Sequence, residues 1–346
     1  MRPTFSIICF TVLSGIGYGA WFLLGLGWTI GPICKPGMLY ARGETLDQCS
    51  APFATPAGLA VAFLLVSAAL LCSLGHLGKP RRAWRALSQW RSSWLSREGI
   101  ASLLTFIPAS ILLAQSIGIP WLQWSATGGH AAASGWFGTE RSDLVLGSLL
   151  SAGSALTVIC TANIYARLEP IRAWHERHVV PAYLLLGLYG GGILLLAATT
   201  LDGRMWLRDR QLLLIGTTVL AAIGAWIKLR YWRSIDAQPP VTAGHATGLE
   251  GLGAVRAFEA PHTEENYLLH EMAFVLARKH ARKLRRIALV AAFLVPALLA
   301  SLALALPAAQ SPAAWFALAS GVAGLFVERW LFFAEAKHAV IAYYQR

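Results

Sequence analysis

The chain has 346 residues, of which 56% are hydrophobic and only 13% are charged. Soluble domains carry about 25% charged residues, so this composition argues against a soluble globular protein. A formal net charge of +12 raises nucleic acid or anionic lipid as partners, but the placement of the basic residues, described below, argues against nucleic acid.

Eight apolar stretches are each long enough to cross a bilayer, which takes about 20 helical residues. They lie at approximately 5–28, 53–76, 98–119, 143–166, 179–200, 211–231, 287–307 and 313–334. Stretches that alternate apolar and polar residues, as in membrane strands, are lacking. Because the backbone must satisfy its own hydrogen bonds in lipid, the sequence predicts an all-α integral membrane protein. We expect one membrane domain, residues 1–346, built as a bundle of eight transmembrane helices.

Met1-Arg2-Pro3 leads straight into the first apolar stretch, which lacks a small-residue cleavage site, so we expect it to be retained as a helix. The loop after it holds Cys34 and Cys49, which we expect to form a disulfide if this loop faces an oxidising periplasm. The other three cysteines lie in predicted helices, and no Cys-x-x-Cys occurs. Zinc or iron–sulfur ligation by this chain is therefore not expected, and we predict no metal site.

The connector between the second and third apolar stretches runs from His76 to Glu98. Six Lys or Arg residues and three Trp residues interleave in it. Trp and Arg are ordinary at a membrane surface, where their apolar parts face lipid and their polar ends face water. An ionisable group at the end of an apolar helix is costly and is a functional candidate by default. His76 and Glu98 are therefore the first candidate site residues.

One long hydrophilic segment, about 233–286, separates the sixth and seventh stretches. It is too short for a separate core, so we expect it to lie against a partner subunit and to return to the membrane as a helix. The last stretch contains Glu328 and Arg329 and is followed by Glu335 and His338. Since Glu328, Glu335 and His338 share a helical face, we expect ion pairs within this helix more than a direct catalytic role.

Most of the 29 Lys and Arg residues, Lys228 among them, fall in the loops on the side of the His76–Glu98 connector. The positive-inside rule therefore predicts that this side and both termini are cytoplasmic. Docking of an acidic partner is a compatible second explanation for the charge.

Two motifs carry a close resemblance to the membrane-anchor subunit of the dimethyl sulfoxide reductase family: His76-Leu77-Gly78-Lys79-Pro80-x-Arg82 and Ser93-Trp94-Leu95-Ser96-Arg97-Glu98. Two further stretches also resemble it: Ala277-Arg278-Lys279-His280-Ala281 and Arg329-Trp330-Leu331-Phe332-Phe333-Ala334-Glu335-Ala336-x-His338. The resemblance implies a bacterial cytoplasmic-membrane subunit without a molybdenum or iron–sulfur centre of its own. It would anchor a molybdopterin catalytic subunit and a four-cluster iron–sulfur subunit, and would exchange electrons with quinone, ubiquinone being the expected type.

The resemblance also implies which residues form the quinone site. The family's quinol-site histidine, arginine and glutamate would correspond to His76, Arg82 and Glu98, with Gly78 and Trp94 in the same motifs. His76 would bond the quinone headgroup, and Glu98 would relay a proton. Weaker candidates are Arg329, Glu335 and His338.

The segment 233–286 is more similar to the anchor of sulfite-oxidising complexes of the same family, whose catalytic subunits are cytoplasmic. This similarity implies sulfite oxidation coupled to quinone reduction. The alternative is a quinol-oxidising anchor of a reductase for dimethyl sulfoxide or another oxyanion.

Three other functions stay open at this point. A haem b cytochrome would need axial histidines, for which His76, His178 and His338 are the candidates. The chain could also be an assembly anchor without quinone chemistry. A transporter is disfavoured because we find no repeat and because the ionisable residues cluster at one surface.

Overall fold

A computed structural model of the chain describes residues 4–30, 55–75, 79–117, 140–202, 207–239, 242–253, 255, 258–259, 276–306, 309–339 and 342. His76, Gly78, Cys34 and Cys49 lie outside these described residues, and so does most of the returning part of the hydrophilic segment.

All eight predicted spans are present as helices long and apolar enough to cross a membrane. They are α1 (Phe5–Ile30), α2 (Pro56–Leu74), α3 (Trp94–Ser116), α5 (Glu140–Ala166), α6 (Val179–Asp202), α7 (Leu207–Ala237), the joined run of α10 (Leu276–Leu289), η4 (Val290–Leu294) and α11 (Val295–Ala305), and α12 (Gln310–Ala334). Short helices are η2 (Pro80–Gln89), α8 (Ala243–Thr247) and η3 (Glu250–Leu252). The prediction of an all-α membrane bundle is confirmed.

Several helix boundaries differ from those expected from hydropathy. The third helix begins four residues earlier than predicted, because Ser93 caps it and accepts a hydrogen bond from the Ser96 backbone N–H at 3.4 Å. This places Glu98 inside the helix instead of at its first residue. The seventh span is continuous with the basic helix before it through a π-helical turn at Val290–Leu294.

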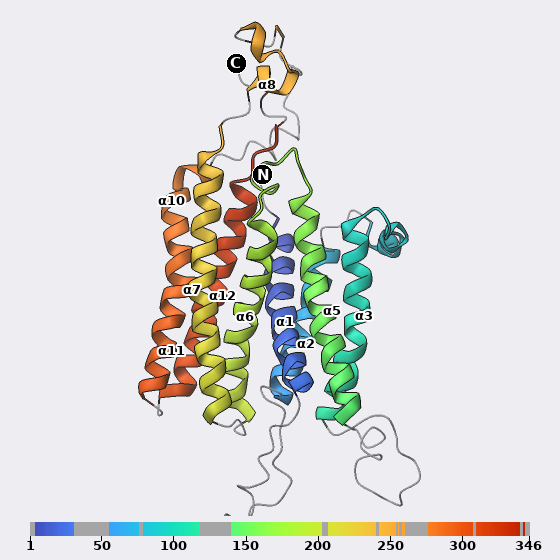
Figure 1. The fold of residues 1–346 in the computed structure, drawn as a ribbon, viewed down its shortest axis with the longest axis vertical. Helices are drawn as coiled ribbons and strands as arrows, with labels where there is room; N and C mark the ends of the chain where they lie inside the picture. The colour runs from blue at the N-terminus through green and yellow to red at the C-terminus, as the bar shows by residue number, and fades with distance from the viewer. Residues whose placement is uncertain are drawn as a thin grey trace, which may run out of the picture.

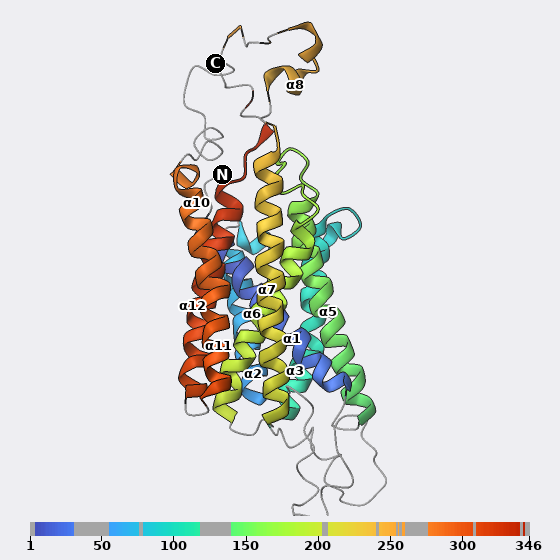
Figure 2. The ribbon, with the colours of Figure 1, turned by 60° about the vertical axis from the view of Figure 1, so that its left-hand side comes forward.

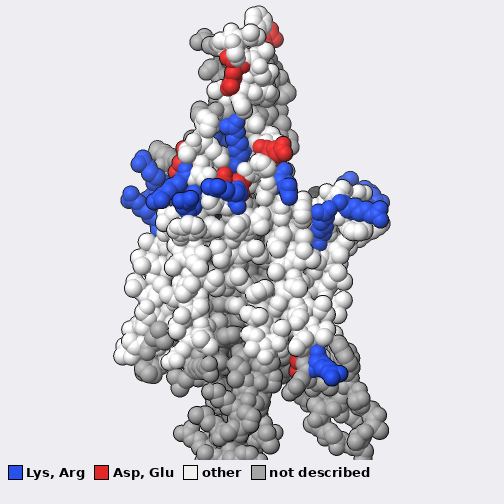
Figure 3. All heavy atoms as spheres, viewed as in Figure 1, with Lys and Arg blue, Asp and Glu red and all other residues white. Residues whose placement is uncertain are grey.

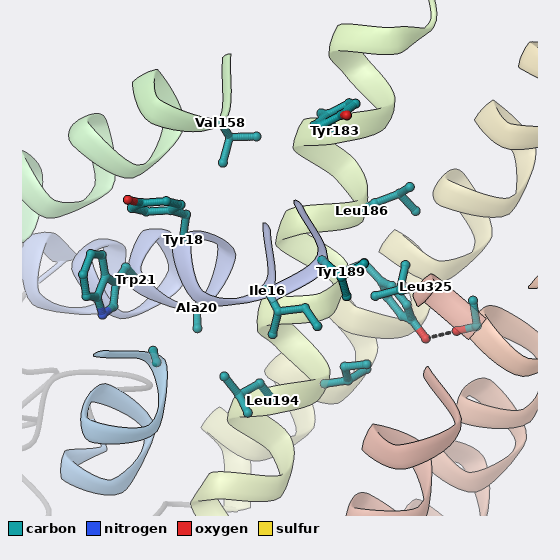
Figure 4. Packing of buried hydrophobic residues seen from close by; sticks show 14 of the residues in the cluster. Ile16, Tyr18, Ala20, Trp21, Val158, Tyr183, Leu186, Tyr189, Leu194 and Leu325 are labelled. Atoms are coloured by element: carbon teal, nitrogen blue, oxygen red, sulfur yellow. Dashed lines mark hydrogen bonds between the residues drawn. The ribbon is translucent and has the colours of Figure 1, made fainter. Parts of the chain in front are cut away.

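The bundle is arranged around α1, which packs against α2, α5 and α6 (Figures 1 and 2). In Figure 1, α3 lies on one flank of the bundle and α7, α10, α11 and α12 lie on the other. The glycine-rich centre of α6 packs closely against α1: a Cβ on Gly191 would collide with the backbone of Gly19 and Ala20. Figure 4 shows Ile16 and Ala20 of α1 beside α6.

Charge is distributed along the bundle as a membrane-spanning protein requires. Figure 3 shows Lys and Arg gathered at the end where η2 and α10 lie, above a wide belt of uncharged side chains. The segment with α8 and η3 projects beyond this same end (Figures 1 and 2). We call it the connector end, because η2 belongs to the His76–Glu98 connector.

Candidate functional site: a buried polar layer at the connector end

The carboxyl of Glu98 is buried inside the bundle, one turn into α3. Its side chain accepts a hydrogen bond of 2.5 Å from the Thr161 hydroxyl on α5, and the residue is 6% exposed. One turn further along α3, Ser102 shares a 2.6 Å hydrogen bond with Tyr18 of α1. Glu98 could be identified from the sequence, but none of these three hydroxyl residues could, since a Thr, Ser or Tyr in an apolar helix gives little signal without knowledge of its neighbours.

The connector is fastened to the start of α3 by side chains of α3. The Ser96 hydroxyl donates to the Ala86 carbonyl. The Arg97 guanidinium donates to the carbonyls of Trp90 and Arg91 at 2.9 and 2.6 Å and stacks on Trp94, 4.4 Å from the ring centroid. These contacts hold the connector against the first turn of α3, the part of the helix that leads to Glu98.

The predicted site residues around the connector therefore occupy different environments. Arg82 is exposed on η2, Trp94 is half-buried at the start of α3, and Glu98 is buried between α3 and α5. The structure brings Trp94 and Glu98 onto one helix end but places Arg82 at the surface.

A second group of buried charges joins α7 to α12. The Lys228 ammonium lies 2.6 Å from one oxygen of Glu328, and both side chains are 2% exposed. Arg329 lies 3.7 Å from the other oxygen of Glu328, and its guanidinium stacks on Tyr183 of α6 at 4.0 Å from the ring centroid. Charges within a membrane bundle are expensive unless they are paired, so this arrangement needs all its members.

Glu335 lies just beyond the end of α12 and pairs with Arg285 of α10, the first helix of the seventh span. The Arg285 guanidinium of α10 donates to Glu335 at 2.9 Å and to Asp236 at 2.6 and 2.9 Å. Burial raises the pKa of the Glu335 carboxyl, although Arg285 opposes this.

The expectation of ion pairs within the last helix is wrong in its main point. The close partners of Glu328 and Glu335 come from α7 and α10, and only the 3.7 Å contact between Arg329 and Glu328 joins two residues of α12. Lys228, interpreted from sequence as a positive-inside charge, is instead buried. His338 packs outside α12 and is half-buried.

Aromatic side chains fill the space between the two charged groups. Tyr165 of α5 stacks on Tyr183 at 6.0 Å between ring centroids, and it also contacts Trp174, Phe332 and Phe333. Tyr165 lies one helical turn along α5 from Thr161, the hydrogen-bond partner of Glu98. One polar layer thus extends from Glu98 on α3 through α5, α6 and α12 to Lys228 on α7, and we call it the polar layer.

A cavity lies near the opposite end of the bundle, between α6, α7, α11 and α12. Its volume is about 110 Å³, and its lining is mainly apolar. Arg210 and Gln310, joined by a 2.7 Å hydrogen bond, lie at its rim. Its position separates it from the polar layer.

No group of three or more His, Cys, Asp or Glu residues that could hold a metal ion occurs within the described ranges. Of the haem-ligand candidates, His178 is engaged through Nδ1 with Glu176 at 2.8 Å.

Comparison with known proteins assigns the chain to a family. The family model of the DMSO reductase anchor subunit (DmsC) matches residues 1–117. The chain is also 31% identical over 351 aligned residues to a protein of Allochromatium vinosum that is named as a subunit of sulfite dehydrogenase, covering 100% of this chain and 99% of that protein.

This chain belongs to the DmsC family of anchor subunits. It is accordingly a multi-pass membrane protein and the membrane anchor of an oxidoreductase complex, with catalytic and electron-transfer subunits as partners.

The region matched by the DmsC family model contains α1, α2, η2 and α3, and hence both Tyr18 and Glu98. The other members of the polar layer, from Thr161 to Arg329, lie beyond this region and come from α5, α6, α7 and α12. In this anchor subunit, Glu98 is the described residue best suited to proton exchange, since it combines a carboxyl, a hydroxyl donor and near-complete burial.

Proposed function

We propose that this anchor subunit reduces quinone with electrons from a sulfite-oxidising molybdopterin and iron–sulfur complex in the bacterial cytoplasmic membrane. Sulfite is favoured over dimethyl sulfoxide because the relative named for sulfite dehydrogenase is similar over the whole chain, whereas the DmsC family model covers residues 1–117. The observation that carries the quinone role is the buried carboxyl of Glu98 at the membrane end of the connector.

Quinone, when bound, accepts two electrons and two protons. The residues at the start of α3 suit such a ligand: a carboxyl that exchanges protons, hydroxyls that orient it, and aromatic rings on neighbouring helices. Glu98 would hold the proton, and Thr161 would fix the direction of the carboxyl. His76, on the residue pattern of the family, would bond a quinone carbonyl.

The connector end would face the cytoplasm and carry the partner subunits. The basic residues gathered there satisfy the positive-inside rule (Figure 3). Exposed pairs of Arg and Trp, such as Arg85 on Trp84 and Arg91 on Trp90, offer a surface for an acidic partner.

The proposal is tested by deleting this chain from a cell that makes the complex. Membranes should lose sulfite-dependent reduction of decylubiquinone. Sulfite oxidation with a dye that takes electrons directly from the soluble partners should persist. Sulfite-dependent quinone reduction at the original rate without this chain would refute the proposal. If intact membranes instead reduce dimethyl sulfoxide with quinol and leave sulfite unchanged, the reductase alternative is correct.

A further inference from the structure

The polar layer contains buried polar atoms that lack hydrogen-bond partners. Seven such side-chain atoms occur in the part of the chain that the structure describes, and four of them belong to or adjoin the layer. They are Tyr183 Oη, Glu328 Oε2, Arg329 Nε and Glu335 Oε2. Their concentration in one place is unexpected for a bundle whose other buried hydroxyls mostly donate to backbone carbonyls within their own helices.

Unpartnered polar atoms inside a protein bind water where there is a polar site with several partners. Tyr183, Glu328 and Arg329 meet this condition together, because the guanidinium of Arg329 contacts both other side chains. Glu335 supplies a further unpartnered oxygen beside Arg285. Water bound here would complete the hydrogen bonding of each group.

These groups also connect the surface to Glu98. At one end, Asp236 is 60% exposed and pairs with Arg285, which bonds Glu335. Arg285 and Lys228 both lie over the ring of Trp232, at 5.5 and 5.2 Å from its centroid, and Lys228 pairs with Glu328.

From Glu328 the connected groups continue toward Glu98. Arg329 lies on Tyr183, and the Tyr183 ring stacks on Tyr165. Tyr165 lies one turn along α5 from Thr161, whose hydroxyl donates to Glu98. The polar layer therefore runs between an exposed carboxylate and the carboxyl assigned to the quinone site.

We propose that the polar layer binds a row of internal water molecules and conducts protons from the surface at Asp236, past Glu335, Glu328 and Tyr183, to Glu98. This inference rests on the proposed function. For each quinone reduced, two electrons arrive from the partner subunits and two protons leave the water phase. Each proton crosses the layer and passes from the Glu98 carboxyl to a quinone carbonyl oxygen, so that the quinol leaves neutral.

Tyr183→Phe is the most informative variant, because it removes a single oxygen atom. That oxygen makes no well-formed hydrogen bond with the described residues, and the Arg329 guanidinium lies over the face of the Tyr183 ring. The variant keeps the ring on which the Arg329 guanidinium stacks, so we expect folding, measured by thermal unfolding of the solubilised subunit, to change little. Tyr189→Phe is the matched control: Tyr189 is a buried tyrosine on the same helix, but its hydroxyl donates to the Ala292 carbonyl, away from the layer (Figure 4).

The assembled complex is assayed in membranes for sulfite-dependent reduction of decylubiquinone in H₂O and in D₂O, with dye reduction measured in parallel. Tyr183→Phe and Glu335→Gln should each lower quinone reduction at least about tenfold and enlarge its solvent isotope effect, while dye reduction stays within about twofold of wild type. Tyr189→Phe should keep both rates within about twofold.

If the Tyr183→Phe complex reduces quinone at the wild-type rate, the proton route is overturned. An unchanged solvent isotope effect in this variant would overturn it too. Glu98→Gln separates this failure from failure of the proposed function. If Glu98→Gln is impaired while Tyr183→Phe is not, the route is wrong and the quinone role stands. If neither is impaired, both are wrong.

Discussion

Glu98→Gln should lower sulfite-dependent quinone reduction by at least about a hundredfold, because positioned general acids and bases contribute about 10²–10⁴-fold to rates. The amide has nearly the shape of the carboxyl and can still accept the hydrogen bond from Thr161. It cannot release or take up a proton. The measurement is steady-state decylubiquinone reduction by the assembled complex.

Asp143→Asn provides the matched control for neutralising a carboxyl. Asp143 lies on α5, as does the hydrogen-bond partner of Glu98, but near the far end of that helix, where its contact is with Ser142. This variant should reduce quinone at the wild-type rate, and both variants should keep dye-linked sulfite oxidation. An unimpaired Glu98→Gln complex would show that Glu98 takes no part in proton transfer.

Lys228→Met should destabilise the protein by about 3–5 kcal/mol, the usual cost of removing one member of a buried ion pair. The reason is that Glu328, 2% exposed, would lose its 2.6 Å partner and retain only the 3.7 Å contact with Arg329. Thermal unfolding of the purified, detergent-solubilised subunit, and the amount of folded protein in membranes, measure this effect.

The double variant Lys228→Met, Glu328→Gln should regain only part of the lost stability. It removes the carboxylate that the single variant leaves without its lysine, but the buried guanidinium of Arg329 then lies beside a neutral amide. If the polar layer conducts protons, the double variant should reduce quinone more slowly than wild type, because the ionisable groups of Lys228 and Glu328 are missing from the route. A Lys228→Met subunit as stable as wild type would contradict the structural role assigned to the pair.

The architecture could be predicted from sequence because lipid imposes simple requirements. A helix that crosses the bilayer needs an apolar stretch of known length, and each of the eight was recognisable. Glu98 was also recognisable, because a carboxyl within an apolar stretch has a cost that stands out in any single sequence.

Which helices contact each other could not be predicted in the same way. Lys228 and Glu328 lie 100 residues apart in the chain, and nothing in either helix indicates that α7 and α12 meet. Lys228 was therefore interpreted as a topology signal, and Glu328 was expected to pair within its own helix. Tyr183 and Thr161 became candidates only when the structure placed them beside Arg329 and Glu98.

The position of the quinone is the central claim, and photolabelling tests it most directly. The assembled complex is irradiated with an azido-substituted ubiquinone, and the labelled peptides are identified by mass spectrometry. We predict label on the connector and the first turns of α3, within residues 76–98, which decreases when unmodified quinone competes. Label confined to α7 and α11, around the cavity with Arg210 at its rim, would contradict this position.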